Sequence, residues 1–215
     1  MLKKITDYIK TNNVSTTEVS DALSKNGSLE NVRPIDYQNS HQVVGRILCV
    51  FAYNDSNYLV HDKIKKVKKN DIVIVFTQDC FGKSIIGDII SKYLLLYKQA
   101  RGIVVLGNVR DLPRLIKEKY PIWCHGFNPV GVKNVFTGNF PKKDQKLILK
   151  RYEGGIAVCD LTGVVVIEKK DVNSKILNRI KSIEKQEDIW YHCLDVKKWD
   201  TKKIIVEKAY NKSKI

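Results

Sequence analysis

The sequence predicts an α/β fold built around a mostly parallel sheet. Two runs, residues 71–76 and 103–106, are dense in β-branched side chains, as expected of strands that are covered on both faces. An amphipathic helix is predicted between them, over residues 88–100. A strand, a helix and a second strand in this order are typical of the right-handed crossover that joins neighbouring parallel strands.

Two helices are expected before the sheet, over the first ten residues and over residues 15–25. In the second of them, Ser15 and Glu18 have the spacing of a capping box, in which each side chain bonds to the other residue's backbone. Asn26 and Gly27 then end the helix, because both tolerate a left-handed backbone.

Further along, strands and helices alternate. In chain order the pattern predicts a strand at 43–52, a short helix at 61–67, a loop at 82–87, a helix at 112–120 and a strand at 121–124. Two strands, 155–160 and 163–167, are predicted to form a hairpin with a two-residue turn, followed by an amphipathic helix at 171–188.

The chain shows no change in composition that would divide it. We therefore expect a single domain over residues 1–215, with helices added to the core at the N- and C-terminal ends of the chain. The tail, residues 189–215, is the least legible part, although Trp199 and the apolar run 204–206 indicate that it packs against something.

The formal net charge of +15 would suit a polyanionic partner. However, only 7 of the 38 basic residues are arginine, and the lysines are spread through amphipathic segments. Proteins that bind nucleic acid rely on arginine forks and interleaved aromatic side chains. The composition therefore predicts a solvated, lysine-rich surface and argues against a nucleic-acid partner.

The five cysteines are scattered, and no two have CxxC spacing, so neither a disulfide framework nor a zinc site is indicated. Their expected role is that of small buried apolar side chains. The first ten residues lack a signal-peptide core, and no apolar run is long enough to cross a membrane. We expect a cytoplasmic protein with reduced thiols and no membrane partner.

Two strand ends carry the residues most suited to chemistry. Strand 71–76 leads through a loop into the helix at Asp88, and strand 103–106 leads through Gly107 into Arg110 and Asp111. Ligands of α/β sheets collect beyond the carboxyl ends of parallel strands. If the two strands are neighbours, one crevice receives the side chains of Asp88, Arg110 and Asp111 and the backbone amides of Ile89 and Ile90.

Each of these groups suits a carboxylate ligand and a cation. The guanidinium of Arg110 offers a planar fork for a carboxylate or keto oxygen, and amides at a helix start attract negative charge. Asp111 is a hard oxygen ligand of the kind that Mg²⁺ takes singly while it keeps several waters, one of which Asp88 would hold. The alternative is structural: Asp111 caps a helix and Arg110 makes a surface ion pair.

Six blocks of sequence, in order, resemble the RraA-like family, which includes the class II 4-hydroxy-4-methyl-2-oxoglutarate (HMG/CHA) aldolases. Gly107-Asn-Val-Arg-Asp111 is similar to the family's GxVRD motif. The other blocks lie at residues 16–23, 70–75, 87–90, 120–126 and 157–166, and the resemblance covers about residues 15–188.

The resemblance implies a swivelling β/β/α core that assembles as trimers or hexamers, with the site at a subunit interface. It further implies that the arginine matching Arg110 contacts the pyruvate moiety, that the aspartate matching Asp111 binds Mg²⁺ or Mn²⁺, and that the acid matching Asp88 acts through metal-bound water. In this picture Asp88 and Arg110 are catalytic. The substrate carboxylate is held at the start of the helix, where Gly87, Ile89 and Ile90 lie.

Three departures from the family pattern stand out. Twenty-one residues separate Asp88 from Arg110, where the family has twenty, and the end of the intervening helix is the expected place for the extra residue. Asn70 replaces the glycine of a GDVxVV block and should adopt the same left-handed backbone. His125 replaces a common arginine near the rim of the crevice, whereas His41 and His61 are expected to be surface or capping residues.

Three functions follow as hypotheses. The first is a divalent-metal-dependent lyase that acts on a 2-oxo acid, by retro-aldol cleavage or by oxaloacetate-type decarboxylation, and yields pyruvate. The second is a non-catalytic, protein-binding regulator of RNA degradation, although a basic surface would repel basic RNA-binding segments. The third is a specialised pathway enzyme for another carboxylated or sugar-derived substrate, which the extra residue, His125 and the tail motivate.

Overall fold

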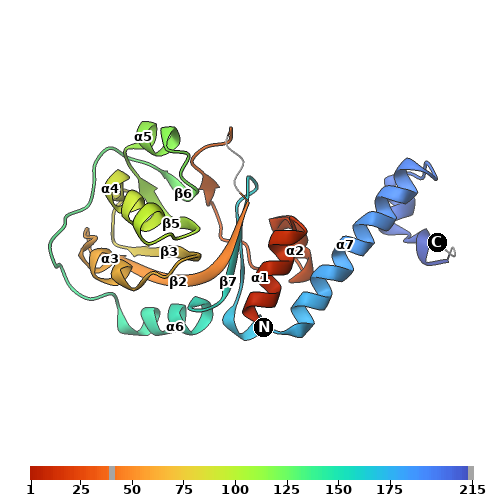
Figure 1. The fold of residues 1–215 in the computed structure, drawn as a ribbon, viewed down its shortest axis with the longest axis horizontal. Helices are drawn as coiled ribbons and strands as arrows, with labels where there is room; N and C mark the ends of the chain where they lie inside the picture. The colour runs from red at the N-terminus through yellow and green to blue at the C-terminus, as the bar shows by residue number, and fades with distance from the viewer. Residues whose placement is uncertain (39–41, 213–215) are drawn as a thin grey trace.

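One curved sheet lies at the centre of the molecule (Figure 1). The computed structural model describes residues 1–38 and 42–212, and over these ranges the sheet has eight strands. They are β1 (Arg33–Pro34), β2 (Val43–Tyr53), β3 (Asp71–Gln78), β4 (Ser84–Ile86), β5 (Gly102–Val109), β6 (Ile122–Phe127), β7 (Ile156–Cys159) and β8 (Val164–Ile167). Their order is β1-β6-β5-β3-β2-β7-β8, with β4 paired to β5.

The parallel part of the sheet confirms the predicted crossovers. β2 pairs with β3, β3 with β5 and β5 with β6, all parallel, so the ends of β3 and β5 are neighbours. Within these strands, residues such as Ile74 and Val104 are completely buried, which explains why β-branched side chains run on without alternation. The loops that follow β3 and β5 therefore begin side by side at one edge of the sheet.

The remaining strands nearly close the sheet on itself. β7 and β8 form the predicted antiparallel hairpin, in which Asp160 and Gly163 flank the two-residue turn. Residues 28–34 then bridge the two edges: Ser28 pairs with Val165 on β8, and Arg33 pairs with Cys124 on β6. The edges are thereby covered, which removes most of the unpaired strand surface.

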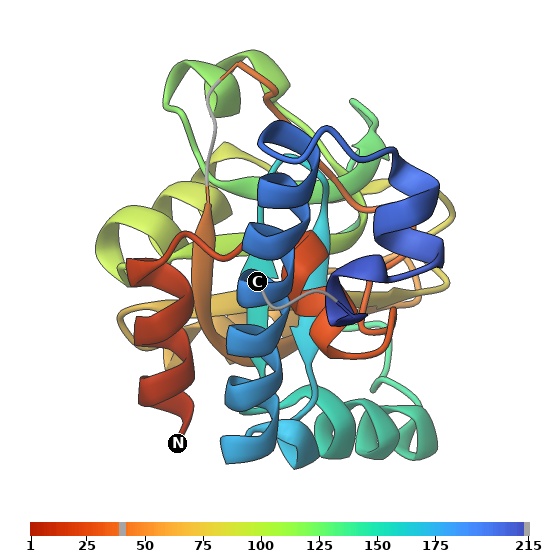
Figure 2. The same cartoon turned by 90° about the vertical axis from the view of Figure 1, so that its right-hand side faces the viewer.

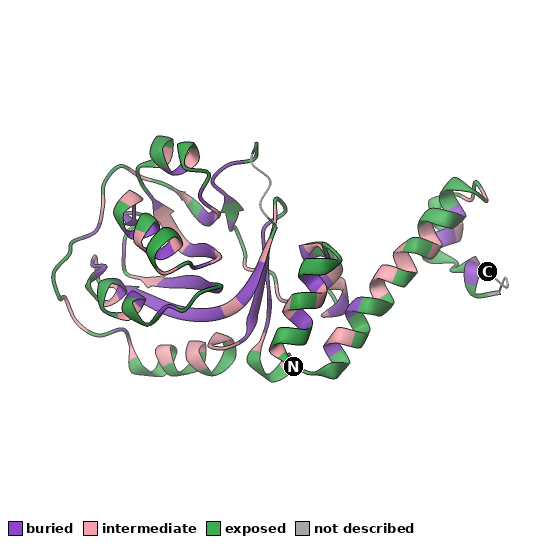
Figure 3. Cartoon of the chain, viewed as in Figure 1, coloured by how far each residue is buried: buried purple, intermediate pink, exposed green. Residues whose placement is uncertain are grey.

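The α-helices are α1 (Leu2–Thr11), α2 (Thr16–Ala22), α3 (Tyr58–Lys63), α4 (Asp88–Lys92), α5 (Leu112–Lys117), α6 (Lys142–Tyr152) and α7 (Ser174–Asp195). Apolar residues of α3, α4 and α5 pack on one face of the parallel strands, and α6 packs on the other face. α1, α2 and α7 cover the hairpin of β7 and β8, and α1 and α7 lie side by side in front of it (Figure 2). Figure 3 shows the buried sheet between these layers.

Several local predictions are confirmed. Ser15 and Glu18 form the capping box of α2. Asn70 has the left-handed backbone expected of it, with φ of 68°. All five cysteines are buried and free of disulfides, and burial raises the pKa of Cys124 to about 12. No helix in the described ranges is long and apolar enough to span a membrane.

Three predictions about secondary structure need correction, and one helix was missed. The loop expected at 82–87 contains β4, which pairs with the end of β5. The helix expected at 88–100 is the short α4 continued by a π-helix, Tyr93–Tyr97. The second helix ends at Ala22, not at residue 25. The sequence analysis missed α6, which has no fully buried residue and therefore no clear apolar pattern. A π-turn takes one residue more than an α-turn, and this one lies in the stretch where the extra residue between Asp88 and Arg110 was expected.

The tail forms a small structure of its own. α7 runs to Asp195, beyond the predicted end of its helix, and projects away from the sheet (Figure 1). A π-helix, Lys202–Val206, then folds back on it, and Cys193, Ile204 and Tyr210 make a small apolar cluster. The expected packing of the tail is therefore largely internal to the tail.

Candidate functional site

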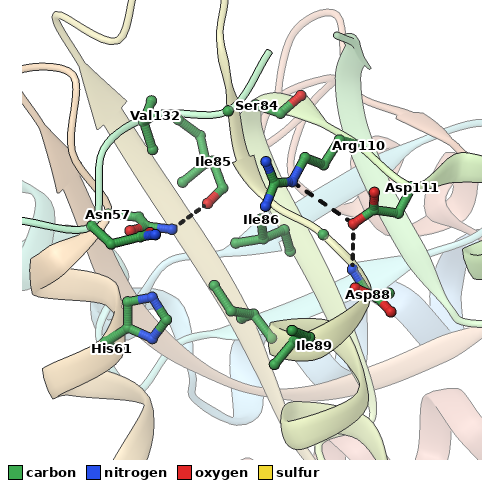
Figure 4. Close-up of a pocket in the computed structure, with 14 residues that line it drawn as sticks. Asn57, His61, Ser84, Ile85, Ile86, Asp88, Ile89, Arg110, Asp111 and Val132 are labelled. Atoms are coloured by element: carbon green, nitrogen blue, oxygen red, sulfur yellow. Dashed lines mark hydrogen bonds and ion pairs between the residues drawn. The ribbon is translucent and has the colours of Figure 1, made fainter. Parts of the chain in front are cut away.

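A small pocket opens at the carboxyl end of the parallel strands (Figure 4). Its volume is about 130 Å³. This is well below the roughly 300–1,000 Å³ of pockets that hold drug-sized ligands, so the pocket suits a small molecule. Its walls come from α3, from the β4–α4 junction, from the β5–α5 junction and from the loop before α6; the lining residues are Asn57, His61, Ser84, Ile85, Ile86, Gly87, Asp88, Ile89, Ile90, Arg110, Asp111, Gly131, Val132 and Asn134.

The pocket brings together the residues that the sequence marked for substrate and metal binding, although not His125, which was expected near its rim. Gly87 and Asp88 lie at the start of α4, and Arg110 and Asp111 lie between β5 and α5. The backbone N–H of Arg110 donates to the carbonyl oxygen of Ile86 at 3.1 Å, which fixes the two junctions against each other. The convergence predicted from neighbouring parallel strands is therefore present.

Asp111 occupies the N-cap position of α5 but does not act as a cap. Its backbone is left-handed, with φ of 62° and ψ of 30°, and among the described residues its side chain makes no capping bond to α5. Instead, Oδ2 accepts a hydrogen bond from the backbone N–H of Asp88 at 3.1 Å, on α4. The geometry therefore does not match the structural alternative of a simple cap.

Gly87 is required by the position of that carboxylate. Its φ of −140° suits any residue, so its backbone does not demand glycine. A Cβ at this position, however, would lie 2.2 Å from Oδ2 of Asp111 and 3.1 Å from Cγ of Arg110. Only glycine leaves room for both side chains.

The guanidinium of Arg110 is held loosely between a glycine and the carboxylate. Nε lies 3.8 Å from Oδ2 of Asp111, and a Cβ on Gly131 would lie 2.6 Å from Nη1. About half of the side chain of Arg110 is exposed, as is 40% of that of Asp111. At this distance the ion pair is weak, so both groups remain accessible to a ligand.

The carboxylate of Asp88 has a partner that the sequence analysis did not identify. Its Oδ2 lies 2.9 Å from Nη1 of Arg114, one turn into α5, and 24% of the Asp88 side chain is exposed. The helical spacing between Asp111 and Arg114 was the available signal, because it places both residues on the α4 side of α5. Asp88 thus meets α5 twice, through its amide and through its carboxylate.

The two isoleucines that follow Asp88 differ in exposure. Ile90 is 7% exposed and packs in the core, whereas Ile89 is 78% exposed beside the pocket. Both line the pocket within the first turn of α4, where amides point toward negative charge. The predicted seat for a substrate carboxylate is therefore next to Arg110.

The predicted positions of two histidines relative to the pocket are reversed in the structure. His61, expected only on the surface, is exposed on α3 but also lines the pocket, together with Asn57. His125 is exposed and is not among the residues that line the pocket, and His41 lies outside the described residues. Sequence spacing could have paired Asn57 with His61, four residues apart on one helix, but it gave no hint that α3 faces the strand ends.

The donors present suit a cation that needs few protein ligands. In the described residues no group of three or more histidine, cysteine or acidic side chains converges as a metal cage. Asp111 and Asp88 both line the pocket, and the carboxylate of Asp111 is the more exposed of the two. Mg²⁺ and similar hard cations bind through one or two carboxylates and keep several waters, so these residues fit such an ion.

Comparison with known proteins places the chain in a family. Residues 16–166 match the RraA-like family (Aldolase/RraA). The chain is 28% identical over 178 residues to the uncharacterized protein MJ0644 of Methanocaldococcus jannaschii, a match that covers 81% of this chain and 82% of that protein. It is 24% identical over 192 residues to Protein DlpA of Legionella pneumophila, covering 82% of this chain but only 29% of DlpA.

Solved structures show the same fold. RraAS2 of Streptomyces coelicolor, an unusual member of the RNase ES inhibitor RraA protein family, superposes with a TM-score of 0.67 at 21% identity. The superposition covers 90% of this chain and 96% of that one. With the family match extending over most of the sheet, the chain belongs to the RraA-like family.

Proposed function

We propose that the protein is a divalent-metal-dependent lyase that cleaves a small 2-oxo acid and releases pyruvate. The observation that carries the proposal is the meeting of Arg110 and Asp111 in one small pocket, with the carboxylate of Asp111 turned away from its own helix. A simple cap of α5 would not need this arrangement. The RraA-like family includes aldolases, which supports the same conclusion.

Each residue has a defined task in this proposal. Arg110 binds the carboxylate or keto oxygen of the substrate through its planar fork. The first turn of α4, at Ile89 and Ile90, holds the substrate carboxylate, and Asp111 holds Mg²⁺ or Mn²⁺. When bound, such a cation acts as a Lewis acid on the 2-oxo group.

The cleavage balances without a further reactant. In a 4-hydroxy-2-oxo acid, the hydroxyl group gives up its proton to a base while the bond between C3 and C4 breaks. The bonding electrons move to the 2-oxo oxygen, and the resulting enolate takes up a proton to give pyruvate beside a carbonyl product. Arg110 lies where it can stabilise the negative charge that develops on the 2-oxo oxygen. Asp88 is the carboxylate we assign to proton transfer.

The ion pair between Asp88 and Arg114 bears on that assignment. Arg114 is 61% exposed, so its guanidinium can leave Asp88 without opening the core. If Asp88 carries a proton, an Arg114→Gln variant should alter the pH profile of the rate. If Asp88 only joins the two helices, the same variant should lower stability and leave that profile unchanged.

The test is pyruvate release from a panel of 2-oxo acids, including 4-hydroxy-2-oxo acids and oxaloacetate, with Mg²⁺ or Mn²⁺. The wild-type protein should release pyruvate at a rate that Asp111→Ala lowers by at least about 100-fold, the scale of losing one preorganised charged group. Equal, negligible rates for both proteins across the panel would remove the proposal.

The proposal retains the homo-oligomer, a trimer or hexamer, that the family resemblance implies. Ile89, beside the pocket, is 78% exposed, and Tyr97, further along the same helical segment, is 72% exposed. We propose that these two apolar side chains contribute to the contact between subunits. Light scattering during size-exclusion chromatography should therefore give a mass of at least three chains.

A protein-binding regulator of RNA degradation is the second candidate, because solved structures with this fold include RraA proteins described as inhibitors of RNA processing. The net charge of +15 would repel basic RNA-binding segments, and the pocket has no evident use in that function.

A specialised enzyme on another carboxylated substrate is the third candidate. His125 and the tail were two of the observations that suggested this third function. Because His125 lies outside the pocket and the tail packs on itself, neither now supports it.

A further inference from the structure

A second hollow lies at the opposite end of the parallel strands from the candidate site. Its volume is about 320 Å³, and its walls are the first residues of β2 and β3, the residue before β5, the turn that precedes β3 and the first two turns of α1. Among the described residues it shares no lining residue with the candidate pocket. We call it the basic pocket, because its charged lining is dominated by Lys3, Arg46, Lys68, Lys69 and Arg101.

Arg46 is held by a buried carboxylate and still has donors to spare. It lies opposite Asp71 in the register of β2 and β3, and its Nε and Nη2 donate to the two carboxylate oxygens at 2.9 and 2.8 Å. Because a guanidinium is planar, Nη1 then points away from Asp71. Nη1 has no partner among the described residues, and one third of the Arg46 side chain is exposed. The pair with Asp71 therefore fixes the orientation of Arg46 without using all of its N–H groups.

Arg101 carries a positive charge that no acidic side chain in the described ranges pairs with. Its side chain crosses the start of β3, where Nη1 donates to the carbonyl oxygen of Val44 at 3.3 Å and Nη2 donates to Oδ1 of Asn70 at 2.8 Å. Both partners are neutral. The carboxylate of Asp71 is already engaged by Arg46 and by the backbone N–H of Lys68. Arg101 is only partly exposed, so water screens its charge incompletely, and a bound anion would supply the missing counter-charge.

The rim adds further positive charge. Lys68 and Lys69 lie in the turn before β3, and both are exposed, with no side-chain hydrogen bond or ion pair to another described residue. The second acidic residue of the lining, Asp7, lies 3.8 Å from Nζ of Lys3, and both of these side chains are exposed. Five basic and two acidic residues thus line the basic pocket, which gives it a formal net charge of +3.

We infer that the basic pocket binds the phosphate group of a small phosphorylated molecule. Arginine forks match the geometry of phosphate oxygens, and a phosphate monoester carries close to two negative charges near neutral pH, against one for a carboxylate. A volume of about 320 Å³ is at the lower end of the roughly 300–1,000 Å³ of small-molecule pockets, so it also admits the organic part of such a molecule. The inference does not depend on the proposed function, because the two pockets have separate linings.

A purely structural role explains only part of this arrangement. The pair of Arg46 and Asp71 joins β2 to β3, and that use accounts for both residues. It does not account for Arg101, which brings a second guanidinium toward the strand that carries the first. The exposed lysines of α6, among them Lys142 and Lys146, line a more open hollow that contains no arginine. They provide a matched control, because they offer charge without the forks.

The test measures the binding of glycerol 3-phosphate, inorganic phosphate and glycerol to the full chain by calorimetry. A chelator keeps divalent cations away from Asp111. The wild-type protein should bind glycerol 3-phosphate saturably and should not bind glycerol. Inorganic phosphate should bind at least about threefold more weakly than glycerol 3-phosphate, because it lacks the organic part.

Variants locate the binding. Arg101→Gln should raise the dissociation constant for glycerol 3-phosphate at least about 10-fold, the effect of losing one charged hydrogen-bond donor. The double variant Lys68→Gln/Lys69→Gln should do the same, and because both lysines are exposed it folds even if Arg101→Gln does not. Lys142→Gln/Lys146→Gln, which removes two charges from α6, should leave the constant within twofold of wild type.

Several outcomes would overturn the inference. They are the absence of saturable binding in wild type, an unchanged constant in both the Arg101 and the Lys68/Lys69 variants, and an equal loss in the α6 control, which would indicate a general attraction of anions. A similar loss in Arg110→Ala would place the phosphate in the candidate site instead. Inorganic phosphate that binds as tightly as glycerol 3-phosphate would contradict the assignment to a phosphorylated organic molecule.

Discussion

The carboxylate of Asp111 bonds to a helix that is not its own: Oδ2 accepts from the backbone N–H of Asp88 at 3.1 Å. This bond joins the start of α4 to the start of α5, and it places the carboxylate beside the guanidinium of Arg110. The site is therefore a junction of two loops whose parts depend on one another, and changes at the junction should affect ligand binding before they affect folding.

The first prediction concerns the space at Gly87. Gly87→Ala should displace the carboxylate of Asp111, because the new Cβ would lie 2.2 Å from Oδ2. We expect pyruvate release to fall at least about 10-fold, while the melting temperature changes by less than about 4 °C, the shift that accompanies 1 kcal/mol in a chain of this size. Steady-state kinetics and thermal unfolding measure the two effects.

A second glycine provides the control for this substitution. Gly154 has a positive φ of 80°, yet a Cβ there would meet nothing within 4 Å. Gly154→Ala should therefore cost about 1 kcal/mol of stability through backbone strain and leave the activity of the folded protein intact. The same loss of activity in both alanine variants would argue against a specific role for Gly87.

The second prediction is that lysine cannot replace Arg110. Arg110→Lys keeps the charge but loses the planar fork that binds a carboxylate through two parallel hydrogen bonds. We expect kcat/KM to fall by at least about 100-fold, with stability unchanged because 48% of the side chain is exposed. Arg179→Lys, which alters a remote contact with Ser24, is the matched control and should retain full activity.

The third prediction concerns how stability depends on pH, and its residue, Glu168, is not part of the pocket. Glu168 follows β8, and 18% of its side chain is exposed. Partial burial opposes its ionisation, but hydrogen bonds from Arg151 and Lys170 outweigh burial and lower the pKa of Glu168. The unfolded chain therefore takes up this proton at a higher pH than the folded protein does. The stabilisation is complete at neutral pH and is lost as pH falls through the lowered pKa.

Glu168→Gln should remove that dependence. Urea unfolding at pH 7 and pH 3 should show that the free energy of unfolding falls less with acid in the variant than in wild type. Glu207→Gln is the control, because Glu207 lies 3.9 Å from Lys202 in an exposed pair and should contribute almost nothing. Equal acid sensitivity of wild type and Glu168→Gln would contradict the assignment.

The sequence was sufficient for the half of the pocket formed by strand ends. Asp88, Arg110 and Asp111 follow buried strands, and parallel strands bring such ends together, so their meeting was predictable. The fold followed from the same β-branched runs. The left-handed backbone of Asn70 followed from its place where the resembling family has glycine, because asparagine tolerates the same conformation.

The other half of the pocket depends on packing that no local pattern encodes. Asn57 and His61 face the strand ends only because α3 lies on the same face of the sheet as α4. Nothing in the sequence distinguishes Arg114 from the other basic residues, because its contact with Asp88 arises only from the packing of α5 beside α4. Likewise the π-turn at Tyr93–Tyr97 looks like α-helix in its apolar pattern, since only the hydrogen bonding differs.

The most direct test of the account is the affinity for pyruvate with and without Mg²⁺, measured by calorimetry on wild type and Asp111→Asn. Asparagine keeps an acceptor for the amide of Asp88 and tolerates the left-handed backbone, so this variant should fold normally. We predict that Mg²⁺ tightens pyruvate binding at least about 10-fold in wild type and has no effect in Asp111→Asn. An affinity that Mg²⁺ leaves unchanged in wild type, or tightens equally in both proteins, would contradict the claim that Asp111 holds a cation that contacts the ligand bound by Arg110.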